Sequence, residues 1–457
     1  MPTPITSGPE GSEEDAKCTT PLNIAVLGQG AVGGVVIDAL YNGASHLSER
    51  AGRPLHLSAI HRRDTAKAGQ FYQENKELYR GIDEIVRDPD IHLVCELMGG
   101  IDTARTAIQE ALMHGKHVVS ANKALFASQW PELLKLARAN DVQVRFEAAV
   151  AGGIPILNGL ATGTIAEHVR ELRGIINGTT NFMLTKMEAE RLSFEQCLRV
   201  AQQEGYAEAN PDADVLGHDA CQKLSLLIAH AFGKHISPEN IPTIGIDSLT
   251  AKDIEHAGSM NPPMRIKLIA RAEEVDGQII ARVGPELVLA DSPIGQVPAN
   301  LNAIEVRSDF NQKGNFYQGE GAGGKPTAAS VLSDIVNIAR VGNGYVSPFG
   351  KPVAEASNNV DTRQHTFYVR FVINDCVGVV HDMTGILKKF GISLNSIVQS
   401  PYDATIRDHL PFYITVEDTD EATLRTALQE ISQLPFNVEA PQYIRFERDD
   451  LWRQQRK

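Results

Sequence analysis

The sequence contains little cysteine, and the few cysteines are scattered. They are odd in number, and no two of them have the spacing of metal ligands: Cys18, Cys95, Cys197, Cys221 and Cys376. This pattern argues against a disulfide scaffold and against a cysteine-based metal site. It is typical of reduced thiols in the cytoplasm.

Positive charge and long apolar runs are also lacking. Lysine and arginine number 43 against 57 acidic residues, and the net charge of −14 argues against nucleic acid or an anionic membrane as the main partner. No apolar run approaches the roughly 20 residues that span a bilayer. The N-terminus has no signal-like region of basic and apolar residues. We therefore expect a cytoplasmic protein without a membrane partner.

The length of 457 residues is too great for one hydrophobic core, so we expect two or three domains. The first twenty residues are polar and acidic, which predicts a disordered leader. A second stretch rich in Gly, Pro, Ser and Asn, late in the chain, predicts a linker. The expected segments are 1–20, 21–150, 151–344, 345–363 and 364–448.

A glycine-rich motif follows the first apolar run of strand length. NIAVL leads into GQGAVG and then into a helical pattern, and this order predicts dinucleotide binding. Gly28 permits the tight turn, Gly30 lets backbone approach a pyrophosphate, and Gly33 lets helix pack on strand. The expected cofactor-binding residues are Gly28, Gly30, Ala31, Val32 and Gly33. The alternative is a structural turn without a ligand.

The end of the second predicted strand bears on the choice of dinucleotide. An NAD site usually has Asp or Glu there, to hold the ribose 2′-hydroxyl. Here the strand at residues 55–60 is followed by Arg62 and Arg63, which can hold a 2′-phosphate bidentately. We therefore predict NADP, with NAD as the alternative if the arginines form only a basic surface turn.

Two later predicted strands end in residues suited to a ligand crevice. Residues 90–96 lead into Gly99, and residues 117–120 lead into Lys123. Ligands bind outside the carboxyl ends of parallel strands. We therefore expect Gly99 beside the cofactor and Lys123 to point toward the crevice.

The last strand of this region, residues 142–146, ends at Glu147 beside a tight glycine turn. A carboxylate in such a place can gather backbone carbonyl groups around a hard cation. The spacing does not distinguish Na⁺ or K⁺ from the absence of a metal.

Residues 205–224, GYAEANPDADVLGHDACQKL, concentrate acidic residues ahead of a lysine. The acids are Glu208, Asp212, Asp214 and Asp219, and Lys223 lies one helical turn after the last of them. An acidic loop that leads to a buried lysine can hold the ammonium group of a small zwitterion and supply an amine as proton acceptor. The alternative is a capped helix start with one i,i+4 pair and a solvated loop.

Two other motifs can bind an anion at the start of a helix. Residues 177–181 (NGTTN), which include Gly178 and Thr179, form a polar turn that can bind a carboxylate or cap a helix. Residues 318–327 form a second glycine-rich loop ahead of a helical pattern.

The pattern changes beyond the predicted linker. The expected strands and helices, in chain order, are 366–373, 379–390, 393–399, 412–416, 422–434 and 443–447. This is the βαββαβ order of ferredoxin-like domains. The alternative is a plain stability or oligomerisation domain.

Together these motifs resemble those of homoserine dehydrogenase, over about residues 21–344. The shared motifs are GQGAVGG, ELMGG, SANKALFA, FEAAVAGGIPI, GIINGTTNFML and the acidic stretch. The C-terminal part resembles an ACT domain, a small amino-acid-sensing module, although Val377 stands where many ACT domains have proline. The resemblance implies an α/β fold: an N-terminal Rossmann domain, an α+β substrate and dimerisation domain, and a ferredoxin-like ACT domain.

The resemblance also implies the reaction, the NAD(P)-dependent interconversion of L-homoserine and L-aspartate 4-semialdehyde in threonine, methionine and isoleucine biosynthesis. Lys223 would be the acid/base residue, and Lys123 would lie beside nicotinamide and substrate. Glu208 would bind the substrate amino group, while Asp214 and Asp219 would shape the same pocket.

Further implied sites involve the two glycine turns. A monovalent cation such as Na⁺ would bind Glu147 together with the carbonyl groups of Val150, Gly152 and Ile154. Gly323, in the second glycine-rich loop, would reach the cofactor. An ACT domain implies a possible amino-acid effector, threonine, and its exposed sheet edges favour a homodimer or homotetramer.

Two other functions are compatible with parts of the pattern. An ACT-bearing dehydrogenase of the phosphoglycerate type places its fingerprint in mid-chain and uses a His–Glu pair, which is not evident here. A nucleotide-binding amino-acid sensor without catalysis would have no reason to hold Lys123 and Lys223 in one pocket.

Overall fold

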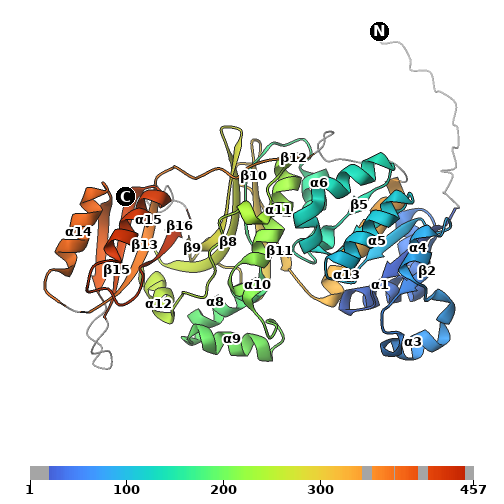
Figure 1. The fold of residues 1–457 in the computed structure, drawn as a ribbon, viewed down its shortest axis with the longest axis horizontal. Helices are drawn as coiled ribbons and strands as arrows, with labels where there is room; N and C mark the ends of the chain where they lie inside the picture. Colours follow the sequence, from blue (N-terminus) through green and yellow to red (C-terminus); the bar gives the residue numbers. More distant parts are fainter. Residues whose placement is uncertain (1–19, 342–352, 375, 400–409, 448–457) are drawn as a thin grey trace, which may run out of the picture. The chain divides into compact units, whose positions relative to one another are not determined.

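The computed structural model describes residues 20–341, 353–374, 376–399 and 410–447. They form two compact units (Figure 1). The first contains residues 20–122, 134–146 and 331–341, and the second contains the other described residues. Nearly all of the predicted leader lies outside the described residues, as do the first part of the predicted linker, Asp375 and the final residue of segment 364–448.

The first unit is built on a parallel sheet with the strand order β2-β1-β3-β4-β5. Its strands are β1 (Leu22–Leu27), β2 (Leu55–His61), β3 (Leu93–Glu96), β4 (His117–Ser120) and β5 (Val144–Arg145). The strand order reverses between β1 and β3, and the loops after these two strands border the crevice where ligands bind in such sheets. The predicted Rossmann-like parallel sheet is therefore confirmed.

Helices connect the strands of this sheet (Figure 1). They are α1 (Ala31–Asn42), α2 (Ala44–Ala51), α3 (Gly69–Glu74), α4 (Ile82–Arg87) and α5 (Asp102–Met113). Two longer helices, α6 (Lys123–Ala139) and α13 (Gly324–Val341), have residues in both units. The first eleven residues of α6, beginning with Lys123, belong to the second unit.

The second unit contains a mixed sheet of nine strands in the order β11-β10-β6-β8-β9-β16-β13-β15-β14. The strands are β6 (Val169–Ile175), β8 (Met264–Val275), β9 (Gln278–Leu289), β10 (Leu301–Ser308), β11 (Asn315–Glu320), β13 (His365–Ile373), β14 (Ser393–Gln399), β15 (Leu410–Thr419) and β16 (Gln442–Phe446). β16 pairs with β9 in parallel and with β13 in antiparallel fashion, so one sheet joins the middle of the chain to its C-terminal part.

The helices of the second unit include those that carry the acidic stretch. They are α7 (Ile156–Asn158), α8 (Gly178–Glu190), α9 (Phe194–Gln203), α10 (Asp212–Val215), α11 (His218–Phe232), α12 (Ala251–Ser259), α14 (Val379–Lys389) and α15 (Glu421–Ile431). The expectation that residues before Gly217 form only a loop was wrong. The helix α10 begins there after Pro211, and the side chain of Asn210 accepts a hydrogen bond from the Asp212 amide.

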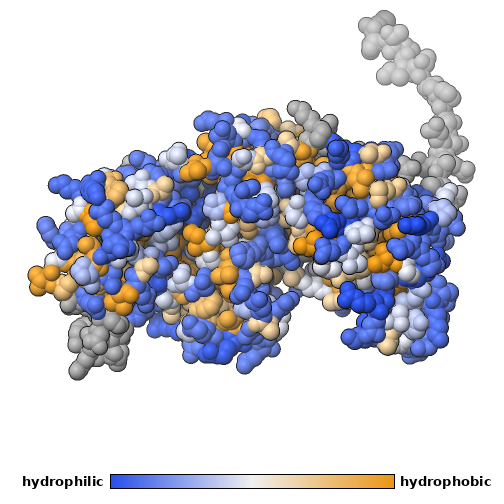
Figure 2. Space-filling model, in the orientation of Figure 1, coloured by the Kyte–Doolittle hydropathy of each residue, from blue (hydrophilic) through white to orange (hydrophobic). Residues whose placement is uncertain are grey.

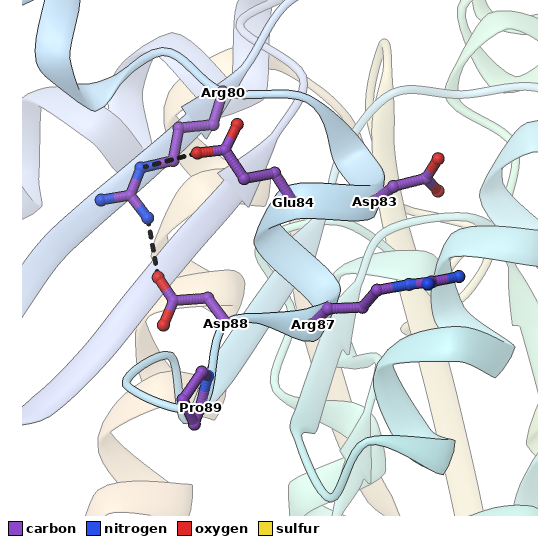
Figure 3. Close-up of a pocket in the computed structure, with 6 residues that line it drawn as sticks. All are labelled: Arg80, Asp83, Glu84, Arg87, Asp88 and Pro89. Carbon is purple, nitrogen blue, oxygen red and sulfur yellow. Dashed lines mark hydrogen bonds and ion pairs between the residues drawn. The ribbon is translucent and has the colours of Figure 1, made fainter.

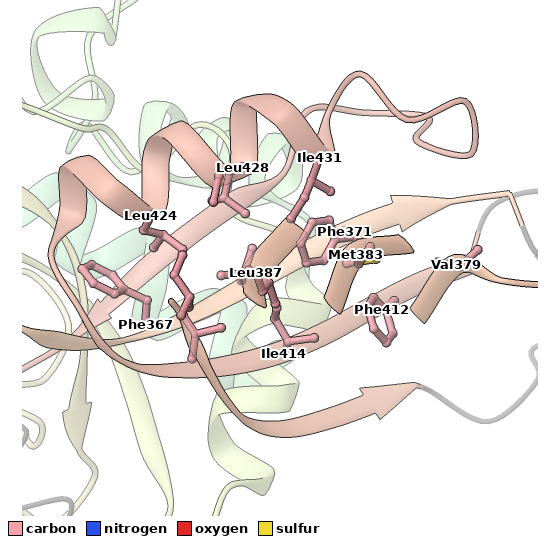
Figure 4. Packing of buried hydrophobic residues seen from close by; sticks show 14 of the residues in the cluster. Phe367, Phe371, Val379, Met383, Leu387, Phe412, Ile414, Leu424, Leu428 and Ile431 are labelled. Carbon is pink, nitrogen blue, oxygen red and sulfur yellow. The ribbon is translucent and has the colours of Figure 1, made fainter. Parts of the chain in front are cut away.

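The C-terminal strands and helices follow the predicted βαββαβ order, and α14 and α15 cover one face of their sheet (Figure 1). Alternate residues of β13, among them Phe367 and Phe371, pack against both helices (Figure 4). The intervening residues face the other way, where Tyr368 and Arg370 bind the carboxylate of Asp253 on α12. This part of the chain is therefore anchored to the rest of the second unit through side chains as well as through β16.

The described part of the predicted linker is not structureless. β12 (Ala354–Glu355) pairs in parallel with β7 (Lys234–His235). Elsewhere the visible surface is mostly polar, with small apolar groups between (Figure 2). Among the described residues, no helix combines the length and the apolar character that crossing a membrane requires.

Candidate active site

Two lysines bind one carboxylate in the second unit. Lys223 Nζ donates to Asp219 Oδ2 at 2.7 Å, and Lys123 Nζ lies 3.2 Å from Asp219 Oδ1. Lys223 also donates to the carbonyl of Ile176, just beyond the end of β6, at 2.8 Å. The structure thus brings together the two predicted catalytic lysines, although the sequence places them a hundred residues apart.

Local sequence explains why Asp219 and Lys223 face each other. Gly217, with φ of +82°, ends the acidic stretch and lets α11 begin. Asp219 lies in the first turn of α11, and Lys223 follows one turn later on the same face. Both side chains are buried, so the pair is shielded from solvent, unlike a surface i,i+4 pair. The burial of this pair goes beyond the alternative of a capped helix start with one i,i+4 pair, although the preceding loop is exposed as that alternative expects.

Asn177 connects this pair to a second carboxylate. Its Nδ2 donates to Asp214 Oδ1 at 2.7 Å and to Asp219 Oδ2 at 2.9 Å. Its Oδ1 accepts from the Thr180 amide and so caps α8. The sequence predicted this turn as a cap or as a carboxylate-binding turn, but it did not single out Asn177 itself. A cap residue whose amide group also carries two donors was the available signal.

The pKa values of the two carboxylates are shifted in opposite directions. Burial raises the pKa of Asp219, but the charges of Lys223 and Lys123 outweigh burial, so that the pKa is lowered to about 2. Burial raises the pKa of Asp214, the Asn177 hydrogen bond lowers it, and the nearby charge of Asp219 raises it, with a net increase. Asp219 is therefore a firm anion, while Asp214 takes up a proton more readily than an ordinary aspartate.

The other predicted substrate residues lie at different distances from this cluster. Thr179 Oγ1 donates to the carbonyl of Tyr206 at 2.7 Å, which ties α8 to the acidic stretch. Gly178 lies so close to the carbonyl of Asn300 that an added Cβ would be 2.6 Å from its oxygen. Glu208 is exposed, and within the described residues its carboxylate has no hydrogen-bonding partner. The structure does not bring Glu208 into contact with the cluster.

The first glycine motif has the geometry that the fingerprint predicts. Gly28 has φ of +107°, and a Cβ there would lie 2.4 Å from the carbonyl oxygen of Leu97. A Cβ on Gly33 would lie 1.9 Å from the oxygen of Gly28, whereas one on Gly30 would meet nothing within 4 Å. Gly30 precedes α1, whose first residues are Ala31 and Val32. Two glycines are thus required by packing, and one leaves open space where a ligand can approach.

A cleft of about 420 Å³ lies along this motif. Its lining residues are Gly28, Gln29, Gly30, His61, Arg62, Arg63, Asp64, Lys67, Leu97, Met98 and Thr103. Arg62 Nη1 donates to the carbonyl of Gln29 at 2.6 Å, so this arginine also holds the glycine turn in place. Arg63 is exposed. Three cationic side chains against one carboxylate make the cleft suited to a phosphate group.

A buried carboxylate shapes the exits of β3 and β4. Glu96 Oε1 accepts from the Met98 amide and Oε2 accepts from Ser120 Oγ, both at 2.8 Å. Gly99, with φ of +74°, continues the first of these exits. Sequence reasoning treated Glu96 only as the end of a strand, because an acidic residue there carries no further local signal.

A second cavity of the first unit, about 560 Å³, differs from this cleft in the charge of its lining residues (Figure 3). Its residues are Arg80, Asp83, Glu84, Arg87, Asp88 and Pro89. Arg80 pairs with Asp88 at 2.7 Å and lies 3.9 Å from Glu84. Because carboxylates outnumber arginines there, this cavity is poorly suited to an anionic cofactor.

The second glycine-rich loop packs against the turn after Glu147. A Cβ on Gly152 would lie 2.5 Å from the carbonyl oxygen of Gly321. Gly323 has φ of +125° and precedes α13. The side chain of Asn302 is fully buried beside Gly321, and neither of its polar atoms has a partner among the described residues. No pattern in the sequence indicates a role for this asparagine.

Three of the four predicted cation ligands already have other partners. Glu147 accepts from the amides of Leu157 and Asn158 at 2.8 and 2.7 Å, so it caps the short helix α7. The Gly152 carbonyl accepts from Ser330 at 2.7 Å, and that of Ile154 accepts from the Ile156 amide at 2.8 Å. The donor atoms are all oxygens, which fits a hard cation. Within the described residues, no three His, Cys, Asp or Glu side chains gather as metal ligands.

Comparison with known proteins shows which family the chain resembles. Residues 28–147 match the model of the homoserine dehydrogenase NAD-binding domain, and residues 155–336 match that of homoserine dehydrogenase. Homoserine dehydrogenase of Synechocystis is 35% identical, with 93% of this chain and 99% of that protein covered.

Solved structures agree with this result. A homoserine dehydrogenase from Thiobacillus denitrificans superposes with a TM-score of 0.85 at 34% identity, covering 94% of this chain and 99% of that one. A hyperthermophilic archaeal homoserine dehydrogenase mutant in complex with NADPH has a TM-score of 0.58 at 25% identity and covers 70% of this chain and 98% of its own. The chain belongs to the homoserine dehydrogenase family of NAD(P)-dependent oxidoreductases.

Proposed function

We propose that the protein interconverts L-homoserine and L-aspartate 4-semialdehyde at the cluster around Asp219, as a step of threonine, methionine and isoleucine biosynthesis. The observation that carries this proposal is the pair of lysines bound to one buried carboxylate beside Asn177 and Asp214. A sensor without catalysis would have no use for that arrangement.

The roles of the two lysines follow from their surroundings. Oxidation of a primary alcohol needs a group that takes the hydroxyl proton while the hydride leaves the same carbon for the nicotinamide. Lys223 is buried, and Asp219 and the Ile176 carbonyl fix its amine, so we assign the proton transfer to it. The side chain of Lys123 is 41% exposed and is assigned a place beside the nicotinamide and the substrate.

The substrate is a zwitterion, so its two charged groups need partners of opposite sign. We assign the ammonium group to Glu208, and we assign Asp214 and Asp219 to the walls of the same pocket. The carboxylate is assigned to Gly178 and Thr179, whose amides lie in the first turn of α8, where intrahelical acceptors are lacking.

The assay for this proposal follows absorbance at 340 nm with L-homoserine and either NADP⁺ or NAD⁺. We expect homoserine-dependent reduction by the wild type and its near-complete loss in Lys223→Ala. Lys186→Ala is the matched control, because that lysine pairs with two surface acids, Glu190 on α8 and Glu204 just after α9. No reduction with either cofactor, and no oxidation of reduced cofactor by the semialdehyde, would favour the non-catalytic sensor.

NADP is the proposed cofactor. The basic cleft beside the glycine motif supports it, and a relative was solved in complex with NADPH. We further propose a monovalent cation such as Na⁺ at Glu147, with the carbonyl groups of Val150, Gly152 and Ile154. Gly323 of the adjoining loop is proposed to reach the cofactor.

We propose that the C-terminal βαββαβ part is an ACT domain that binds L-threonine and regulates the enzyme. Its support is the strand order and the contact of Tyr368 and Arg370 with Asp253 on α12, which links it to the rest of the second unit. Threonine at millimolar concentration should lower the initial rate of the full chain, and unchanged kinetics would contradict regulation.

A homodimer or homotetramer is proposed as well. β14 is an edge strand, and Ile397 and Val398 on it are about 40% exposed, which favours pairing with another chain. Light scattering after size exclusion should give at least twice the chain mass of 49.7 kDa. A species of the single-chain mass would contradict this proposal.

A further inference from the structure

A buried lysine outside the Asp219 cluster contacts α8, the helix whose first residues belong to the NGTTN motif. Lys267, on β8, is only 3% exposed. Its Nζ donates to Asn181 Oδ1 at 2.8 Å and to the carbonyl of Val297 at 3.0 Å. The lysine therefore joins the sheet to α8 and to the segment before β10.

The charge of Glu188 acts on Lys267 from a distance, but that carboxylate is bound by Arg265. Within the described residues no carboxylate lies within ion-pair distance of its Nζ, and its two hydrogen-bond acceptors are neutral oxygens. Burying an ammonium group without a counter-ion is costly. Desolvation by burial lowers its pKa to about 8, so it is still mainly a cation at neutral pH. An apolar residue would fill this position in the sheet at lower cost, so packing alone does not explain the lysine.

Asn181 connects Lys267 to the active-site cluster. Asn181 Nδ2 donates to the carbonyl of Leu301 at 3.2 Å, and its amide donates to the carbonyl of Asn177 at 3.4 Å. Asn177 is the residue that binds both Asp214 and Asp219. Lys267 therefore contacts α8 one helical turn after Asn177, the residue that binds both carboxylates.

A neighbouring residue offers an internal comparison. Arg265, two residues earlier on β8, donates to Glu188 on the same helix at 2.8 Å. Residues 265 and 267 share a face of the strand, and residues 181 and 188 are two turns apart on α8. Both contacts attach α8 to β8, but the Arg265 contact is exposed and lies at the far end of the helix from Asn177.

We propose that Lys267 is a positioning residue for the proposed reaction: through Asn181 it holds the start of α8, and with it Asn177, in register with Asp214, Asp219 and Lys223. This inference rests on the proposed function. It assigns Lys267 no contact with substrate or cofactor.

The test compares Lys267→Met, Lys267→Arg, Asn181→Ala and Arg265→Met in the full chain. For each we would measure kcat, the KM values for homoserine and cofactor, and the thermal unfolding midpoint. We expect Lys267→Met and Asn181→Ala to lower kcat by about 10-fold or more, because small displacements of reacting groups have large effects on rate. The KM for the cofactor should stay within about twofold, and Lys267→Arg should restore most of the rate.

Two controls separate positioning from general stability. Arg265→Met removes the other attachment of α8, and we expect it to leave kcat within about twofold even if it lowers the unfolding midpoint. The double variant of Lys267 and Asn181 should lose no more activity than either single variant, because both lie on one route.

The outcomes are distinct. Unchanged kcat in folded Asn181→Ala, or equal losses of kcat in Arg265→Met and Lys267→Met, would overturn the positioning role while leaving the homoserine reaction in place. If Lys267→Met does not fold, Asn181→Ala and Lys267→Arg still decide the question. A wild type without homoserine-dependent activity would instead contradict the proposed function itself.

Discussion

The carboxylate of Asp219 lies 2.7 Å from the ammonium group of Lys223, one turn later on the same helix, and both side chains are buried. The second oxygen of that carboxylate is bound by Lys123. A single anion therefore fixes two lysines that come from different helices. A substitution that removes the charge of Asp219 should therefore weaken its contacts with Lys223 and Lys123 together.

Asp219→Asn is the first prediction. The loss of the anion leaves two lysines without their shared counter-charge, and removing one partner of a buried ion pair costs roughly 3 kcal/mol or more. We expect kcat to fall by about 100-fold, since correctly held acid–base groups contribute at least that much. Urea unfolding and the 340 nm assay measure the two effects. Asp212→Asn, an exposed acid of the same stretch, is the control and should change neither quantity.

The second prediction separates the glycines of the first motif. Gly28→Ala places a methyl group 2.4 Å from the Leu97 oxygen at a φ of +107°, so we expect a loss of roughly 3 kcal/mol in unfolding free energy. A methyl group at position 30 would have no atom within 4 Å, so the unfolding free energy of Gly30→Ala should stay within about 0.5 kcal/mol of wild type. If the dinucleotide approaches Gly30, the KM of the Gly30→Ala variant for the cofactor should nevertheless rise about tenfold. Unchanged cofactor kinetics in Gly30→Ala would place the pyrophosphate elsewhere.

The third prediction concerns the 2′-phosphate of the cofactor. Arg63 is exposed in the basic cleft, and a hydrogen bond to a charged group is worth about 1.5–3 kcal/mol. We expect Arg63→Ala to raise the KM for NADP⁺ by about tenfold and to leave the KM for NAD⁺ unchanged. Arg87→Ala, at the acidic cavity of Figure 3, should alter neither value. An equal change for both cofactors would remove the argument for NADP selectivity.

The fourth prediction is a pH dependence of stability. The pKa of Lys267 is about 8 in the folded protein and about 10.5 when the chain is unfolded, so the unfolded state binds more protons between these values. The cost of burying the charge is therefore complete below pH 8 and is relieved as the pH rises to 10.5. Over this pH range the unfolding free energy therefore rises by about 3 kcal/mol, in favour of the folded state. The difference in unfolding free energy between wild type and Lys267→Met, measured by urea at pH 7 and pH 10, should shift by that order. A constant difference would contradict the lowered pKa.

The sequence predicted the features that depend on neighbouring residues. The glycine motif after β1 and the order of strands and helices in the C-terminal part are local patterns, and the structure contains them. Lys223 could be placed one turn after Asp219 by helical spacing alone. Family resemblance placed Lys123 beside the substrate, but its contact with the carboxylate of Asp219 was not predicted, because no local pattern reports a contact across a hundred residues.

Several site features had no local signal. Lys267 interrupts an apolar strand and resembles any surface lysine in the sequence, while its burial depends on α8 packing over β8. Asn302 is buried because Gly321 lies against its amide, a contact between distant segments. Glu208 shows the converse, since its place in the acidic stretch predicts a shared pocket and the structure leaves its carboxylate exposed.

The pairing of β16 with β9 has a consequence for synthesis of the chain on the ribosome. The open side of β9 emerges long before residues 442–446 have been made, and a hydrogen-bonding edge left without its neighbour tends to associate with other nascent chains. The nine-stranded sheet cannot be completed until the later strand arrives. The slow step of maturation is therefore expected to be the closure of this long-range strand pair.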